Sequence, residues 1–300
     1  MCYVLHTTLT TQPHSYFVND HKQSARDVLD PDKCPTRSDY GIPEDKFVFC
    51  NFNQIYKIEP STFAMWMRIL SRVPNSVLWL LRFPALGESN IRAAAKAAGV
   101  PEHRIIFTDV APKDEHLRRG YLADLFLDTP TCNAHTTGCD ILWGGTPMVT
   151  LVGERMASRV AASLLGAASL SELVVGNEKE YEELAVALAM DIDRLWAIRK
   201  KLEDSRLTAP LFDTARWVRN FEQGLKMMWA RHEMGMPPAE IVVPDVMLPA
   251  DHKVGASSAS ASASATASAS TGAGAGAGAS ARANGVPPSQ PLKAWGSQKL

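Results

Sequence analysis

Short apolar runs alternate with segments of helical period from Asp45 onward. Five of these runs have the length and composition of buried strands, and they span residues 46–50, 76–81, 104–107, 125–128 and 147–151. Between the first two runs, apolar residues at offsets 0, 3, 4, 7 and 10 from Phe63 lie on one face of a helix. Pro60 suits the first turn of this helix, and Pro74 follows its end. The pattern therefore predicts strand, helix and strand in succession.

Further segments of helical period follow the other predicted strands. They span residues 89–98, 113–120, 137–143, 178–189 and 191–204, and a long amphipathic helix follows with its apolar face from Trp217 to Met228. A strand–helix–strand unit that recurs four times predicts right-handed crossovers and a doubly wound, mostly parallel α/β sheet. Such sheets bind ligands outside the carboxyl ends of their strands, so polar residues at those ends are the first candidates for chemistry.

The two ends of the chain lack this alternation. Residues 1–40 have weak periodicity. Residues 255–285 are Gly, Ala, Ser or Thr apart from Arg282 and Asn284, so they have nothing large and apolar to bury. We predict that this tract is a linker or a disordered tail. The rest of the chain is rich enough in apolar side chains for a core, since the whole sequence is 46% hydrophobic.

The charge balance disfavours bulk electrostatic attraction to nucleic acid or to an anionic membrane. Lys and Arg number 31 against 32 Asp and Glu, which gives a net charge of −1. The five cysteines are odd in number and form no C-x-x-C pair, which disfavours a disulfide framework and a zinc site. No stretch reaches about 18 apolar residues, and residues 1–11 lack the pattern of a signal peptide. We expect a cytoplasmic or nuclear protein with no nucleic-acid and no membrane partner.

The richest group of polar residues follows the strand predicted at 125–128. The loop after Asp128 carries His135 and opens a helix through Thr136, Thr137 and Gly138. Unpaired amides, the helix dipole and a small glycine form an anion site of the kind that phosphates occupy. An ordinary threonine N-cap is the alternative on local pattern alone.

Two further polar groups follow other predicted strands. Gln54 and Lys57 come after the first strand, and Lys113, His116 and Arg119 recur at helical spacing after the third. Taken singly, the former fits a polar loop and the latter a solvated basic face. Three such groups at carboxyl edges of one sheet together predict a site for a nucleotide diphosphate.

Other motifs give weaker evidence about function than these three groups. Asp191 and Asp193 match the short D-x-D form of metal-dependent sugar transferases, but they lie in a helical stretch away from any strand end. The sequence has no G-x-S-x-G, H-E-x-x-H or G-x-x-x-x-G-K-[ST] motif, which argues against hydrolase, zinc protease and P-loop functions.

Four long runs at these strand ends resemble the catalytic region of protein O-linked N-acetylglucosamine transferases. The runs are FNQIYKI at 52–58, RVPNSVLWLLRFPALGE at 72–88, RIIFTDVAPKDEHLRRG at 104–120 and LDTPTCNAHTTGCDILWGGTPMVTL at 127–151. The similarity extends over about residues 16–229 and is greatest to the plant and algal branch, for instance in YFVNDHKQ and PLFDTARWVRN.

The resemblance implies a fold and a division of the chain. Residues 41–235 would form the Rossmann-like C-terminal lobe of a GT-B glycosyltransferase, with helices at its C-terminal end. Residues 1–40 would be a connecting segment, the remnant of an upstream region, and residues 236–300 a low-complexity tail. In the family another catalytic lobe and tetratricopeptide repeats precede this lobe. The family transfers N-acetylglucosamine from UDP-N-acetylglucosamine to Ser or Thr hydroxyls of proteins, with inversion and without a metal or other cofactor.

The resemblance also implies residue roles. Gln54 and Lys57 would meet the diphosphate, and the amides of Thr136 and Thr137 would hold its other side. Lys113 would reach the ribose and His116 would pack on the uracil, while backbone groups of Ala111 and Arg119 bracket the base. His135 and Asp140 would lie near the phosphate, ribose or sugar, and catalytic roles fall to Lys57 and His135. The alternatives are a protein O-fucosyltransferase that uses GDP-fucose and a nucleotide-binding fragment without turnover.

Overall fold

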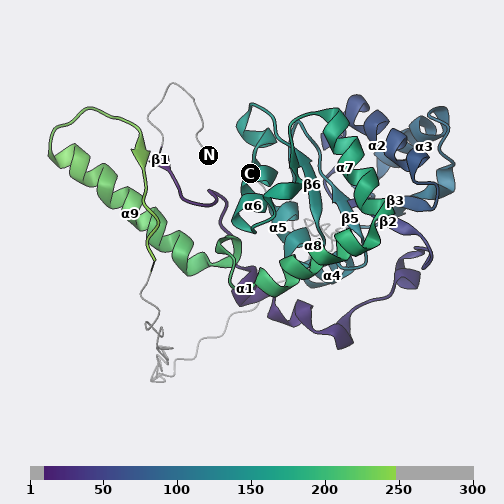
Figure 1. Cartoon of the computed structure of the whole chain (residues 1–300), viewed down its shortest axis with the longest axis horizontal. Coiled ribbons are helices and arrows are strands. Elements are labelled where there is room, and N and C mark those ends of the chain that lie inside the picture. Colours follow the sequence, from purple (N-terminus) through teal and green to yellow (C-terminus); the bar gives the residue numbers. More distant parts are fainter. Residues whose placement is uncertain (1–9, 248–300) are drawn as a thin grey trace, which may run out of the picture. The chain divides into compact units, whose positions relative to one another are not determined.

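A six-stranded parallel sheet forms the centre of the computed structural model, which describes residues 10–247 (Figure 1). The strands run in the order β4-β3-β2-β5-β6-β7. Their bounds are Phe47–Asn51 (β2), Ser76–Leu81 (β3), Ile105–Thr108 (β4), Leu125–Leu127 (β5), Met148–Leu151 (β6) and Val174–Val175 (β7). The central strands β2, β3 and β5 are buried along their whole length and mostly apolar, because helices cover both faces of a parallel sheet. The five predicted strands and the doubly wound parallel sheet are confirmed.

The helices between the strands form two layers. Right-handed crossovers place α2 (Pro60–Arg72) and α3 (Glu88–Ala97) on one face, and α4 (Lys113–Gly120), α5 (Thr136–Trp143) and α6 (Val160–Ala167) on the other. α7 (Glu178–Met190) packs against α2, and α8 (Ile192–Ser205) packs against α7. The side chain of Asp191 accepts a hydrogen bond from the Arg194 amide at 3.0 Å and so caps α8, which agrees with a helical rather than a metal-binding D-x-D.

The predicted long helix is α9 (Thr214–Glu233), of which Asn220 and Gly224 are the buried residues. Beside it β1 (Thr10–Thr11) pairs in parallel with β8 (Ile241–Val242). None of the helices in residues 10–247 is both long and apolar enough to cross a membrane.

Five helices and strands have no counterpart among the predictions, one of them α1 (His21–Ser24) in the segment of weak periodicity. β1, β7 and β8 are two residues long, which is too short for a recognisable period. α6 has no charged residue, and seven of its eight residues are buried, so it has no amphipathic stripe.

Residues 10–40 pack against the sheet and its helices. They include α1 (His21–Ser24) and three short 3-10 turns. The indole N–H of Trp143 donates to the Ala25 carbonyl at 2.9 Å, and Arg37 binds both carboxylate oxygens of Asp124 at 3.0 and 2.9 Å. The described residues thus form one compact unit on both sides of position 40. The division into 1–40, 41–235 and 236–300 stays a prediction about sequence organisation, and the tract at 255–285 lies outside the described residues.

Candidate nucleotide-sugar site

The direction of winding reverses between β2 and β5. The chain passes from β2 outward to β3 and β4, returns to β5 beside β2, and then continues outward on the other side. At such a switch point the loops after the two central strands leave on opposite sides of the sheet, and a crevice opens between them. The groups predicted around Lys57 and His135 follow these two strands.

The loops after β2 and β5 continue the register of the strands. In the sheet Cys50 lies opposite Phe126, an offset of 76 residues. Three hydrogen bonds beyond it keep the same offset: Asn51 Nδ2 to the Leu127 carbonyl at 2.6 Å, Asn53 Nδ2 to Thr129 Oγ1 at 2.9 Å, and Lys57 Nζ to the Asn133 carbonyl at 3.0 Å. The pairing of the strands therefore places the ammonium of Lys57 beside the loop that leads into α5.

Asp128 fixes that loop from within the protein. Its carboxylate accepts hydrogen bonds from the Ala134 amide and from Thr150 Oγ1, both at 2.7 Å, and its carbonyl accepts one from Tyr181 Oη at 2.9 Å. Complete burial raises the pKa of Asp128 to about 6, against the lowering effect of these hydrogen bonds.

Asn133 adds a second set of contacts to the loop. Its side-chain Nδ2 donates to the Thr129 carbonyl at 3.1 Å, and its side-chain oxygen accepts from the backbone amide of Ala161 at 3.2 Å. Asn51, Asn53, Asp128, Thr129 and Asn133 were not among the predicted site residues. The spacing of Asn51 and Asn53, alternate residues at a strand end, was the signal available in the sequence.

The first turn of α5 and Lys57 form the best-supported candidate for an anion site. His135 occupies the N-cap position, and its side chain makes no capping hydrogen bond to any described residue. Burial, and then the positive charge of Lys57, lowers the pKa of His135, so the neutral imidazole is favoured near pH 7. Thr136 and Thr137 follow as the first helical residues. The positive end of the helix and the Lys57 ammonium together favour a bound diphosphate.

His116, Arg119 and Asp140 form a second, buried cluster. Their exposed fractions are 3%, 1% and 4%. Arg119 donates to the Asp109 carbonyl at 2.8 Å and to His116 Nδ1 at 3.1 Å. Because a guanidinium only donates, Nδ1 accepts, and the ring proton lies on Nε2, 3.8 Å from Asp140 Oδ2.

The interpretation of this group as a solvated basic face is therefore wrong for His116 and Arg119. Both rest on Phe52, with the His116 ring 5.6 Å and the Arg119 guanidinium 5.5 Å from its centroid. Packing of the uracil on His116 stays a prediction. Only 3% of His116 is exposed, so little of its surface is open to a ligand in this structure.

The remaining predicted residues lie nearer the surface. Lys113 is 51% exposed, with its ammonium 3.7 Å from Asp20 Oδ1. Ala111 is half-buried in the loop before α4, and Gln54 is half-buried at the start of the 3-10 turn Ile55–Lys57. Within residues 10–247, no group of three or more His, Cys, Asp or Glu is placed to hold a metal ion.

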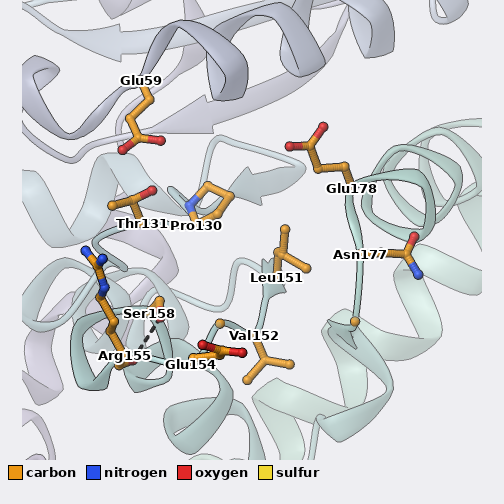
Figure 2. A pocket seen from close by; sticks show the side chains of 12 residues that line it. Glu59, Pro130, Thr131, Leu151, Val152, Glu154, Arg155, Ser158, Asn177 and Glu178 are labelled. Carbon is orange, nitrogen blue, oxygen red and sulfur yellow. Dashed lines mark hydrogen bonds between the residues drawn. The ribbon is translucent and has the colours of Figure 1, made fainter.

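A cavity of about 620 Å³ lies at the carboxyl ends of β6 and β7, bordered by Pro130 and Thr131 of the loop after β5. Glu59, Glu154 and Glu178 lie around it together with Arg155 (Figure 2). None of the predicted donor residues lines this cavity. Three carboxylates against one guanidinium make it a poor place for a diphosphate, so the anion site is better assigned to Lys57 and α5.

Comparison with known proteins finds relatives that match two thirds or more of this chain. A probable UDP-N-acetylglucosamine–peptide N-acetylglucosaminyltransferase of Arabidopsis thaliana is 56% identical over 232 residues, which are 77% of this chain and 24% of that protein. The Caenorhabditis elegans UDP-N-acetylglucosamine–peptide N-acetylglucosaminyltransferase is 52% identical over 202 residues, 67% of this chain and 18% of that protein. The chain thus spans about a quarter or less of the length of these relatives.

A solved structure shares the fold. A mutant of the Thermobaculum terrenum O-GlcNAc transferase superposes with a TM-score of 0.58 at 30% identity, over 62% of this chain and 36% of that one. The fold expected from the resemblance, a Rossmann-like lobe of a GT-B glycosyltransferase, is confirmed. The model of glycosyl transferase family 41 matches residues 18–221, which include all ten predicted donor residues. The chain belongs to glycosyl transferase family 41.

Proposed function

We propose that this chain is the donor-binding lobe of an enzyme that transfers N-acetylglucosamine from UDP-N-acetylglucosamine to Ser or Thr hydroxyls of proteins. The observation that carries the proposal is the pairing of the loops after β2 and β5, which brings Lys57 next to the first turn of α5. The names of the relatives that share this region support the identity of the donor.

The chemistry requires stabilisation of the departing UDP. When the oxygen of an acceptor hydroxyl bonds to the anomeric carbon, the hydroxyl proton is released, the bond from that carbon to the diphosphate breaks, and negative charge grows on the β-phosphate. The Lys57 ammonium and the amides of Thr136 and Thr137 are suited to receive that charge. Gln54, Lys113, His116, Arg119 and the backbone of Ala111 are assigned to the nucleotide, and His135 and Asp140 to the phosphate, ribose or sugar. We propose that no metal takes part.

Partners and location follow from the same assignment. The protein acceptors would approach through an upstream catalytic lobe and tetratricopeptide repeats in the full-length enzyme. The described cysteines Cys34, Cys50, Cys132 and Cys139 are free, which suits the reducing cytoplasm or nucleus that we propose.

Lys57→Ala tests the anion site in the full 300-residue chain. Loss of a charged hydrogen bond costs about 1.5–3 kcal/mol, so we expect UDP affinity by calorimetry to fall about tenfold to a hundredfold. Lys46→Ala is the matched control, because Lys46 donates to Asn75 Oδ1 at 2.5 Å from the opposite end of β2. Lys46→Ala should leave UDP affinity unchanged.

We also expect the chain to bind UDP more tightly than GDP, and to bind UDP equally well in EDTA. Equal UDP and GDP affinity would contradict the assignment of a uridine nucleotide. Loss of UDP binding in EDTA would contradict the proposal that no metal takes part.

Transfer is tested in a protein that joins this chain to the upstream catalytic lobe of a plant relative. The assay uses UDP-N-acetylglucosamine and a Ser-containing acceptor peptide. Expressed as a free energy, the loss of transfer rate in Lys57→Ala should exceed the loss in its free energy of unfolding. A fall in rate of less than about threefold would remove Lys57 from the catalytic machinery.

A further inference from the structure

His21, in the segment ahead of the sheet, touches a predicted donor residue. Its Nε2 lies 2.8 Å from Asp140 Oδ1, although 119 residues separate the two along the chain. Both side chains are buried, with 3% of His21 and 4% of Asp140 exposed. The contact is therefore made away from solvent.

The surroundings of His21 hold its ring in one orientation. Nδ1 lies 3.2 Å from Asn19 Oδ1, and the Asn19 amide nitrogen donates to the Leu211 carbonyl at 2.7 Å, which fixes the side-chain oxygen toward His21. Both ring nitrogens thus lie within hydrogen-bond distance of a side-chain oxygen. The rings of Trp143 and Phe212, each with its centroid 6.0 Å away, flank the imidazole.

Asp140 is the point at which this contact enters the candidate site. It follows Thr136, the first residue of α5, by four positions, so both lie on the same side of the helix. One carboxylate oxygen meets His21 and the other faces His116 Nε2 at 3.8 Å, and His116 in turn accepts from Arg119. Three of the predicted donor residues are joined in one chain of contacts that ends on His21.

We propose that His21 is a positioning residue of the donor site. It holds the Asp140 carboxylate in the orientation that the nucleotide sugar meets, and without it that carboxylate keeps only the 3.8 Å approach of His116 Nε2. The proposal rests on the proposed function of the site. It makes α1, part of the segment expected to be a connection, a component of donor binding.

Two polar substitutions of nearly equal size test the proposal in the full chain. In His21→Gln the side-chain amide reaches the place of Nε2 and can still donate to Asp140. In His21→Asn it is one carbon shorter and reaches only the place of Nδ1. We expect UDP affinity within about threefold of the unmodified chain for His21→Gln, and about tenfold weaker for His21→Asn.

His14→Asn is the control. His14 also pairs with a carboxylate, Asp245 at 3.0 Å, but neither residue is a predicted donor residue. It should not change UDP affinity. Melting temperatures of all variants show whether each is folded at the temperature of the titration.

His21→Asn in an Asp140→Asn background separates a positioning role of His21 from a general structural effect. If His21 acts through Asp140, His21→Asn should change UDP affinity less than about twofold once the carboxylate is gone. Three outcomes would each overturn the proposal. They are an equal loss of UDP affinity from His21→Asn in the two backgrounds, equal UDP affinities of His21→Gln and His21→Asn, and an unchanged UDP affinity of His21→Asn. Failure of the unmodified chain to bind UDP would instead overturn the proposed function, and this assignment with it.

Discussion

At the scale of single residues, the loop between β5 and α5 depends on a carboxylate that the fold makes hard to ionise. Asp128 is completely buried and holds the Ala134 amide and Thr150 Oγ1. Its pKa rises from 3.8 to about 6 because burial removes water from the charged form. The folded state therefore keeps a proton that the unfolded state has already released between these two pH values.

We accordingly expect part of the free energy of unfolding to disappear as pH rises from about 4 to about 6. At 1.36 kcal/mol per pH unit, the loss that Asp128 causes is about 3 kcal/mol. Asp128→Asn does not titrate, so relative to the unmodified chain it should gain that amount between pH 4 and pH 7. Urea unfolding at both pH values measures the difference, and equal changes in the two proteins would show that Asp128 ionises normally.

Asp245 provides the comparison of opposite sign. Hydrogen bonds from Arg216, despite partial desolvation, hold the pKa of its carboxyl well below the usual value. Its contribution to stability is present above pH 4 and is lost as pH falls below it, so Asp245→Asn should not reproduce the behaviour of Asp128→Asn between pH 4 and pH 7.

At the scale of elements, the position of α5 against α6 depends on the absence of a side chain at Gly138. A Cβ at this position would lie 2.8 Å from Leu164 Cδ1 and 3.5 Å from Ala134 Cβ. Leu164 is fully buried and has little space into which to move. The glycine in the predicted phosphate-binding turn thus also serves helix packing, which local sequence does not distinguish from ligand approach.

Gly138→Ala should therefore lower the free energy of unfolding by about 1–3 kcal/mol, as overpacking of a close-packed site does. Gly166→Ala in α6 is the matched control, since the nearest atom to its Cβ would be 4.0 Å away. That change should raise stability by about 0.4–1 kcal/mol through the unfolded state. Denaturant unfolding of both variants measures the contrast, and equal or higher stability of Gly138→Ala would show that α5 and α6 separate easily.

At the scale of the whole molecule, the two ends of the sequence are expected to contribute unequally to stability. Ala25 and Val28 are buried, and Trp143 and Asp140 depend on contacts from residues 10–40. Removal of residues 1–40 would take away these partners and expose the apolar surface that the segment covers. Residues 255–285, by composition, have almost no apolar area to contribute.

We expect deletion of residues 1–40 to lower the melting temperature by more than about 10 °C, from a loss of about 4 kcal/mol or more. Deletion of residues 255–300 should change it by less than about 2 °C and leave UDP affinity unaltered. Calorimetry of the two truncated proteins tests this pair. A stable protein without residues 1–40 would support the view of that segment as a mere connection, and a large effect of the second deletion would show that Trp295 or its neighbours dock on the lobe.

Local sequence determined the helices and strands of this protein whose apolar residues recur with a regular period. Apolar runs such as Ser76–Leu81 predicted strands, and the 3.6-residue spacing from Phe63 predicted α2, because each residue's exposure follows from its own position in a regular element. The alternation of these elements limited the sheet to a doubly wound one. It also placed Lys57 and His135 at carboxyl edges, where the candidate site lies.

Tertiary structure decided which of these edges face one another and what holds them. The common offset of 76 residues between the loops after β2 and β5 depends on which strands pair. The contact of His21 with Asp140 joins positions 119 residues apart. A hydrogen-bonding side chain has many possible partners at such separations, and only the packing of the whole chain selects one, because a buried polar group is stable only beside the partner that satisfies it.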